Sequence, residues 1–309
     1  MHKVPDSYVP KVSLVMTLYN ASTFLAEAVE SVINQTLPCW ELIAVDDGSS
    51  DNSLDILRHY TDSRIRVFSF EQNFGRTAAL NFGCRQSTAD YIAILDADDI
   101  ASPNRLQIQC DFLDDNKCVG IVAGFADFID RYGRIISYYK PLSYPEQLNA
   151  CLSWSMPIVH STMMIRRSIL MDECNGYSDD FSIGHDWHLC VKVAKSYPIY
   201  VLPFFLGSWR KYPSSMTGNR ANFIKGRLES IDILIQAKSL CNSMEAVSRN
   251  RHAMAVNAAA ISYYLFRQMH LIEAINFISM AFSFDIFFFF RVNKVKMFFG
   301  WGSHDSCHP

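Results

Sequence analysis

The chain has 309 residues, of which half are hydrophobic and 19% are charged, and its formal net charge is −3. This composition excludes global disorder and indicates a globular protein with a substantial core. The slight acidity offers no electrostatic basis for binding nucleic acid, so we expect no nucleic-acid partner. Nine cysteines without a C-x-x-C pair fit reduced thiols better than a disulfide framework.

The N-terminal stretch MHKVPDSYVPKVSLVMT lacks the apolar region and the cleavage site of a signal peptide. The most apolar later stretch, residues 271–290, contains Glu273, Asn276 and Asp285, so we predict no transmembrane helix. We therefore expect a cytoplasmic protein.

Strand-like and helical patterns alternate through the first 125 residues. The strand-like runs are residues 12–17, 40–45, 65–70, 91–95 and 119–124. The helical patterns are residues 26–35, 54–60, 75–86 and 105–116. We expect Asn20 to cap the first helix, and Ser102 and Pro103 to begin the fourth. The alternation predicts an α/β fold with a doubly wound, mostly parallel central sheet.

The pattern changes after residue 126. Up to Tyr212, prolines separate short segments of mixed character. From Asn219 onward the sequence is nearly all helical, over residues 223–240, 246–269 and 270–284. This predicts a main domain of residues 1–218 and a helical C-terminal region of residues 219–309.

Polar residues gather where the predicted strands end. They are Thr17, Tyr19 and Asn20 after the first strand, Asp46 and Asp47 after the second, Asn73, Gly75 and Arg76 after the third, and Asp96, Ala97, Asp98 and Asp99 after the fourth. Because parallel strands end at one edge of a sheet, these aspartates converge and repel one another. A bound divalent cation is the usual compensation, and hard oxygen donors favour Mg²⁺ or Mn²⁺.

Each of these pieces has a simpler interpretation when it stands alone. Asp-Gly-Ser-Ser at residues 47–50 is a common turn and helix-cap sequence, and Asp-x-Asp after a strand is a weak motif. We interpret Asp99 as a turn residue. The order and spacing of the whole set are much more specific than any of its members.

These segments resemble family 2 glycosyltransferases of the GT-A fold. The resemblance lies in VSLVMTLYNASTFLAEAVESVINQT, ELIAVDDGSSDNS, NFGRTAALNFGC and YIAILDADD. It is dense from residue 11 to residue 116 and continues more sparsely to residue 217. It implies a nucleotide-binding half at about residues 11–125 and an acceptor half at about residues 126–218.

The resemblance implies a nucleotide-diphosphate-sugar donor, and a UDP-sugar is the commonest choice in the family. The positions that match the family's donor contacts are Thr17, Tyr19, Asn20, Asp46, Asp47, Asn73, Gly75, Arg76, Asp96, Ala97, Asp98 and Arg210. Either Asp46 or Asp47 would accept a hydrogen bond from the base. Asp98 would hold Mn²⁺ or Mg²⁺ most directly, and Asp96 would contact the ribose or the metal.

The resemblance also implies a catalytic base at Asp186, within the segment SIGHDWHLCVKVAK. Trp187 matches the family's usual aromatic residue, whereas His185 stands where the family usually has Glu. A neutral imidazole cannot supply the negative charge of that glutamate. In VHSTMMIRR, His160 is a candidate contact on the acceptor side, and a core or surface histidine is the alternative.

The segment SWRKYPSSMT, residues 208–217, resembles the family's Y-R-x-H loop near the diphosphate. Arg210 matches the motif, and its planar guanidinium would suit diphosphate oxygens. Trp209 replaces the tyrosine, and Tyr212 stands where histidine is common. Some members use that histidine at the metal, and this chain lacks it.

We therefore expect an inverting glycosyltransferase that transfers a sugar to a saccharide or lipid-linked saccharide during surface polysaccharide synthesis. His185 and Tyr212 leave an inactive sugar-nucleotide-binding or scaffold protein as the alternative. A phosphohydrolase that uses the D-x-D is less consistent, because it leaves Asp46, Asp47 and Asp186 unexplained.

Residues 285–301 (DIFFFFRVNKVKMFFGW) mix aromatic residues with Arg291, Lys294 and Lys296. A basic, aromatic-rich helix of this kind can lie on an anionic membrane surface. Packing of its phenylalanines on the preceding helices is an equal alternative. The predicted location is thus cytoplasmic, with peripheral membrane contact through residues 285–301 as one of two options.

Overall fold

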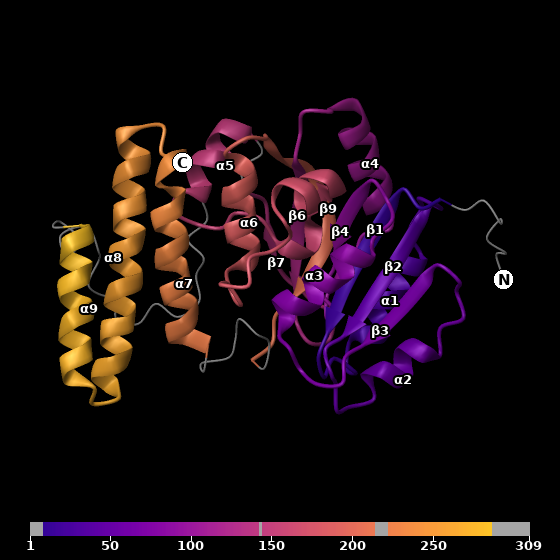
Figure 1. Ribbon diagram of the computed structural model, residues 1–309, viewed down its shortest axis with the longest axis horizontal. Helices are drawn as coiled ribbons and strands as arrows, with labels where there is room; N and C mark the ends of the chain where they lie inside the picture. The colour runs from indigo at the N-terminus through magenta and orange to yellow at the C-terminus, as the bar shows by residue number, and fades with distance from the viewer. Residues whose placement is uncertain (1–8, 142–143, 214–221, 286–309) are drawn as a thin grey trace. The chain divides into compact units, whose positions relative to one another are not determined.

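The computed structural model describes residues 9–141, 144–213 and 222–285 (Figure 1). The chain divides into two compact units: residues 1–145 with 158–213, and residues 146–157 with 214–309. The segment 286–301, which carries nearly all of the predicted membrane-contact region, lies outside the described residues.

The first unit contains a nine-stranded sheet in the order β3-β2-β1-β4-β8-β6-β9-β5, with β7 paired to β6. Its strands are β1 (Val12–Leu18), β2 (Trp40–Asp46), β3 (Ile65–Ser69), β4 (Tyr91–Ile94), β5 (Ile100–Ala101), β6 (Ile121–Ile129), β7 (Ile135–Tyr139), β8 (Met164–Arg166) and β9 (Ile199–Arg210). Its helices are α1 (Leu25–Ile33), α2 (Ser53–Arg58), α3 (Arg76–Gln86), α4 (Arg105–Asp115) and α6 (His185–Ala194), with a 3₁₀ turn η1 (His160–Thr162) and a π-helical turn η2 (Ile169–Glu173).

Strands β1 to β4 run parallel and end at one edge of the sheet (Figure 1). Leu18 lies opposite Asp46, and Asp46 lies opposite Ser69. Beyond β4, strand β8 is antiparallel to both of its neighbours, β4 and β6, while β6 and β9 are parallel. The predicted α/β fold with a mostly parallel sheet is confirmed, and it brings the polar segments after β1, β2 and β4 to the same edge.

Side chains alternate along a strand, so the apolar run of β1 presents apolar side chains on both faces of the sheet. Helices cover both of these faces. Leu14 and Met16 pack in one apolar cluster with side chains of α1 and α4. On the other face α3 approaches very closely, since a Cβ added at Gly83 would lie 2.6 Å from a methyl group of Val15. Glycine at position 83 is thus what allows α3, with Arg76 at its start, to lie directly over the sheet.

Two expected helix starts differ from the structure. Asn20 does not cap α1: its φ is 51°, and its Oδ1 accepts hydrogen bonds from the amides of Ser50 at 2.8 Å and Asp51 at 3.3 Å. Ser102 does not cap α4, which begins at Arg105, because its hydroxyl donates to the carbonyl of Phe205 at 2.9 Å. In both cases a contact with a neighbouring loop or strand replaces the local cap.

The second unit is helical. It contains α5 (Pro145–Leu152) except for its first residue, α7 (Phe223–Gln236), a 3₁₀ turn η4 (Ala237–Leu240), α8 (Met244–Arg267) and α9 (Leu271–Phe284). The last three long helices agree with the predicted helical stretches. Small residues of α8, such as Ala255 and Ala258, pack in one apolar cluster with Ile231 and Ala281 from the neighbouring helices. Within the described ranges, every helix is too short or too polar to cross a membrane.

A matched pair of isoleucines tests the assignment of the core. Ile43 of β2 is 0% exposed, whereas Ile135 of β7 is 51% exposed. We expect Ile43→Ala to lower the free energy of unfolding by about 2–5 kcal/mol, because it leaves a cavity. Ile135→Ala should change it by less than about 0.5 kcal/mol. Denaturant titration of both variants measures the difference, and equal losses would contradict this core.

Candidate active site

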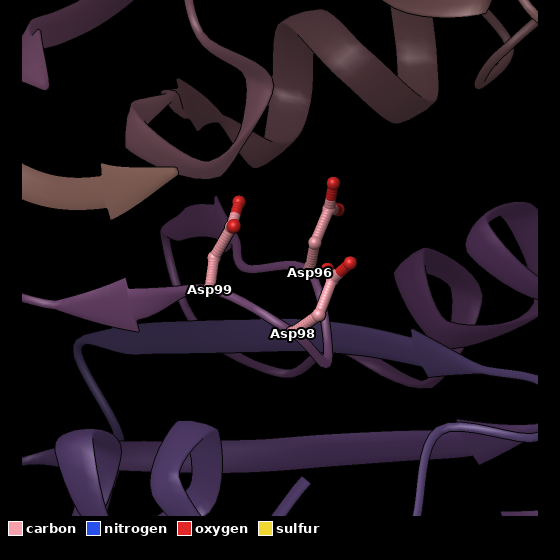
Figure 2. A group of neighbouring side chains, drawn as sticks. All are labelled: Asp96, Asp98 and Asp99. Carbon is pink, nitrogen blue, oxygen red and sulfur yellow. The ribbon is translucent and has the colours of Figure 1, made fainter. Parts of the chain in front are cut away.

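Asp96, Asp98 and Asp99 form an acidic turn directly after β4 (Figure 2). The amide of Asp99 donates to the carbonyl of Asp96 at 3.1 Å, which closes the turn as expected for a turn residue. The side chain of Asp99 is nevertheless only 1% exposed. Carboxylate oxygens of the three residues all lie within 4.8 Å of one another, so Asp99 adds a third carboxylate to the predicted pair.

The carboxylates of the acidic turn repel one another, and the protein offsets this only in part. Burial, and then the charge of Asp96, raises the pKa of Asp98. Burial and the charges of Asp98 and Asp96 hold the pKa of Asp99 well above its usual range. The hydroxyl of Tyr212 donates to Oδ2 of Asp98 at 2.8 Å, and the amide of Arg210 donates to Oδ1 of Asp99 at 2.8 Å.

A divalent cation fits this turn. Oδ2 of Asp99 is buried and makes no hydrogen bond of good geometry with the described residues, although the hydroxyl of Ser161 lies near the carboxylate. Three hard oxygen donors whose negative charge is only partly compensated are the ligand set that Mg²⁺ and Mn²⁺ favour. A group of this composition could therefore hold one such ion.

Arg210 contacts the acidic turn and is 1% exposed. Its Nε donates to the carbonyl of Asp98 at 2.8 Å, and its Nη2 pairs with Glu27 of α1 at 2.6 Å. The guanidinium also lies 4.3 Å from the centre of the Phe24 ring. In this arrangement Arg210 fixes the turn against α1, and a contact with diphosphate remains a prediction.

Two aspartates at the end of β2 organise the neighbouring loops. Asp46 accepts hydrogen bonds from the amide of Ser49 at 3.2 Å and the hydroxyl of Ser69 at 3.1 Å. Asp47 accepts from the amides of Phe74 at 2.7 Å and Gly75 at 2.9 Å. Each carboxylate keeps lone pairs for a further donor, so both stay candidates for the nucleotide base.

The remaining predicted donor residues lie around these loops. Thr17 is partly buried at the end of β1, whereas Tyr19, Asn20 and Asn73 are exposed in the loops after β1 and β3. Ala97 is buried inside the acidic turn. Gly75 has a φ of 96°, and a Cβ added there would meet no atom within 4 Å, so the backbone conformation rather than space favours glycine.

Arg76 connects the acidic turn to α6. Its guanidinium forms an ion pair with Asp96. It also acts electrostatically on Asp186. Burial raises the pKa of Asp186 to about 6, and the amide of Trp187 and the charge of Arg76 oppose part of this increase. Asp186 lies in the first turn of α6, where Trp187 donates its amide to Oδ1 at 2.8 Å. The predicted metal ligand Asp96 and the predicted base Asp186 thus share one partly buried cation.

Two buried histidines line the other side of Arg76. Nη2 of Arg76 lies 3.4 Å from Nδ1 of His160, and Nε2 of His160 lies 2.9 Å from the hydroxyl of Tyr177. Because a guanidinium can only donate, we assign the proton of neutral His160 to Nε2, which then donates to Tyr177. Burial, and then the charge of Arg76, holds the pKa of His160 well below its usual range.

His185 occupies the first position of α6 and is buried against the same group. Its ring lies 5.3 Å from that of His160 and 5.7 Å from that of Tyr177, both edge to face. Neither ring nitrogen makes a hydrogen bond of good geometry with a described residue, although the backbone of Ser182 lies near enough to act on the ring. Burial and Arg76 keep its pKa well below the usual range, so His185 is a neutral group here.

The structure therefore brings Arg76, Asp96, Asp98, His160, His185 and Asp186 together. Sequence reasoning missed the third carboxylate and the part played by Tyr177 and Ser161. Asp99 could have been included because it directly follows the D-x-D, and Ser161 because it follows His160 in the same segment. Nothing in the sequence around Tyr177 indicates its place, since it reaches His160 only through the tertiary fold.

Comparison with known proteins gives a matching family model and many similar chains, which include the following three. Over 71% of its length, the chain is 28% identical to the Escherichia coli UDP-Glc:alpha-D-GlcNAc-diphosphoundecaprenol beta-1,3-glucosyltransferase WfgD, of which 84% is covered. The crystal structure of S. aureus TarS 1-349 in complex with UDP-GlcNAc matches with a TM-score of 0.65 and 19% identity, covering 88% of this chain and 81% of that chain. The mannosyltransferase PcManGT from Pyrobaculum calidifontis, in complex with GDP-Man and Mn²⁺, matches with a TM-score of 0.58 and 20% identity, covering 90% and 76%.

The two solved structures support the fold alone, because their sequence identity to this chain is too low to carry over a function. The family model named Glycosyl transferase family 2 matches residues 13–173, more than half of the chain, and includes the acidic turn. The chain therefore belongs to glycosyl transferase family 2, and it is a glycosyltransferase with the GT-A fold.

Proposed function

We propose that the protein is an inverting glycosyltransferase that transfers a sugar from a UDP-sugar to a hydroxyl of a saccharide or lipid-linked saccharide. The observation that carries this proposal is the arrangement around Arg76, which pairs with Asp96 and acts on Asp186. An acidic turn suited to a metal and a partly buried carboxylate suited to a base thus both interact with one cation. A UDP-sugar and a lipid-linked acceptor agree with the names of TarS and WfgD.

Asp98 and Asp99 would hold a divalent cation, and Asp96 would contribute to the same site or contact the ribose. When bound, such a cation offsets the negative charge that grows on a departing nucleoside diphosphate. Tyr212 orients Asp98 through its hydroxyl, and Arg210 holds the backbone of the turn. These contacts keep the carboxylates in position before any ligand arrives.

Asp186 would act as the general base. It takes the proton from the acceptor hydroxyl while the oxygen attacks the anomeric carbon. The new carbon–oxygen bond forms as the bond to the diphosphate breaks, and that electron pair leaves with the nucleotide. An α-linked donor then gives a β-linked product in a single displacement, and no covalent enzyme intermediate is required.

The neutral histidines clarify how the base would work without the usual glutamate. His160 and His185 remain uncharged, so Arg76 is the charged partner that Asp96 and Asp186 share. Arg76 stabilises the ionised form of Asp186 and opposes the effect of burial. The acceptor would therefore meet a carboxylate that is mostly ionised at neutral pH and still basic enough to take a proton.

Replacement of the base tests the mechanism. We expect Asp186→Asn to lower kcat by about 10²–10⁴-fold, because the amide cannot accept the proton. Donor binding, measured by calorimetry with UDP, should remain unchanged. Asp180→Asn, a nearby exposed position, should retain activity in the same UDP-release assay. Full turnover in Asp186→Asn would remove Asp186 from the mechanism.

The pH dependence tests the coupling between Arg76 and Asp186. Because the base must be ionised, kcat/KM should fall as the pH drops through an apparent pKa of about 6. Arg76→Gln removes a cation that favours the carboxylate, so the limb should move to higher pH. Arg85→Gln, an exposed position in the same helix, should leave the limb in place. A limb that stays fixed in Arg76→Gln would contradict the coupling.

Thermal unfolding tests the metal. With UDP present, Mn²⁺ should raise the melting temperature of the wild type, because a ligand that binds only the folded state stabilises it. Asp98→Asn should lose the increase that depends on Mn²⁺. Without metal this variant should be no less stable than the wild type, since it relieves repulsion in the acidic turn. Asp111→Asn on α4 serves as the control, and an Mn²⁺ effect that survives in Asp98→Asn would contradict the site.

A further inference from the structure

The hairpin of residues 129–140 exposes an unusual number of large apolar side chains. Tyr132, Ile135, Ile136 and Tyr138 are each more than half exposed. Among the residues that the structure describes, β7 pairs with β6 alone and so forms an edge of the sheet. Proteins normally protect such edges, because exposed apolar edge strands invite association.

The same hairpin is basic. Its segment DRYGRIISYYK contains Arg131, Arg134 and Lys140 and a single carboxylate, Asp130, which pairs with Arg134. The guanidinium groups of Arg131 and Arg134 lie 5.5 Å and 5.2 Å from the centre of the Tyr132 ring. Cations interleaved with exposed aromatic side chains suit an anionic bilayer, where the rings enter the interface and the charges meet phosphate.

The hairpin begins beside the acidic turn. Ile129 lies opposite Arg210 in the pairing of β6 with β9. Nη1 of Arg210 donates to the carbonyl of Asp130 at 3.3 Å, while Nε of the same side chain donates to the carbonyl of Asp98. One buried side chain thus joins the base of the hairpin to the candidate metal site.

We propose that the hairpin of residues 129–140 docks on the surface of an anionic lipid bilayer. Docking would place the acidic turn close to the headgroup layer, where the diphosphate of a lipid-linked acceptor lies. The role of docking in reaching a lipid-linked acceptor rests on the proposed function, whereas the docking itself does not. A second copy of the chain is disfavoured, since antiparallel pairing of two β7 strands would bring Arg134 near the Lys140 of the other copy.

Vesicle co-sedimentation without any sugar substrate tests the proposal. Wild-type protein should bind vesicles of equal parts phosphatidylglycerol and phosphatidylcholine, bind phosphatidylcholine alone weakly, and dissociate at high salt. The charge variant Arg131→Gln, Arg134→Gln and Lys140→Gln should bind at least tenfold more weakly. The apolar variant Ile136→Thr and Tyr138→Thr, which keeps residues that favour strands, should show a similar loss.

A matched control separates the hairpin from the C-terminal helices. Ile272→Thr changes an apolar side chain of α9 that is 76% exposed, and it should leave vesicle binding unchanged. Equal loss in this control, or no vesicle binding by the wild type, would overturn the proposal. Sedimentation of a dimer that the apolar variant abolishes, without lipid binding, would assign the surface to a second copy instead.

Two further measurements keep these outcomes interpretable. Unchanged melting temperatures in the variants show that the fold is intact. If the apolar variant unfolds, the charge variant still tests the proposal, because it alters only exposed side chains. Release of UDP from the donor with a soluble acceptor should be unaffected in every hairpin variant. Absence of UDP release by the wild type would count against the proposed function. It would not affect the conclusion drawn from vesicle binding.

Discussion

Asp96, Asp98 and Asp99 place three carboxylates within 4.8 Å of one another after β4, and the folded chain has to compensate their repulsion. Much of the surrounding structure serves this need. Arg76 pairs with Asp96, Tyr212 donates to Asp98, and the amide of Arg210 donates to Asp99. The compensation is incomplete, because the pKa values of Asp98 and Asp99 remain raised. A site that tolerates such a residual charge is suited to a ligand that brings a cation with it.

Arg76 extends this constraint to the other side of the site. Its position follows from Gly83, whose missing side chain lets α3 pack directly on β1 and β2. His160 and His185 lie near the guanidinium and are both neutral, so Asp96 and Asp186 are left as its charged partners. Because histidine stands where the family usually has glutamate, the proposed base Asp186 has no carboxylate directly before it in the chain, and it shares Arg76 with Asp96. That arrangement is a coherent chemical site.

Periodicity in the sequence was sufficient to predict the parallel strands, the three C-terminal helices and the convergence of polar loops at one edge. It was insufficient wherever a side chain finds its partner through the tertiary fold. Asn20 resembles a helix cap yet binds the loop after β2, and Tyr177 reaches His160 from a segment without any motif. Arg210 matches a family position, but only the structure reveals that its guanidinium is buried against Glu27 and Phe24. The grouping of residues 146–157 with the C-terminal helices is likewise invisible in chain order.

Arg210 joins the acidic turn to the base of the hairpin of residues 129–140. Arg76 joins the same turn to Asp186 electrostatically. The central claim is that the acidic turn is completed by a metal ion that accompanies the nucleotide. Anomalous scattering from a crystal grown with UDP and Mn²⁺ tests it most directly. We predict a manganese peak within bonding distance of the carboxylates of Asp98 and Asp99. Bound UDP with no metal at the turn, or with manganese held by other residues, would contradict it.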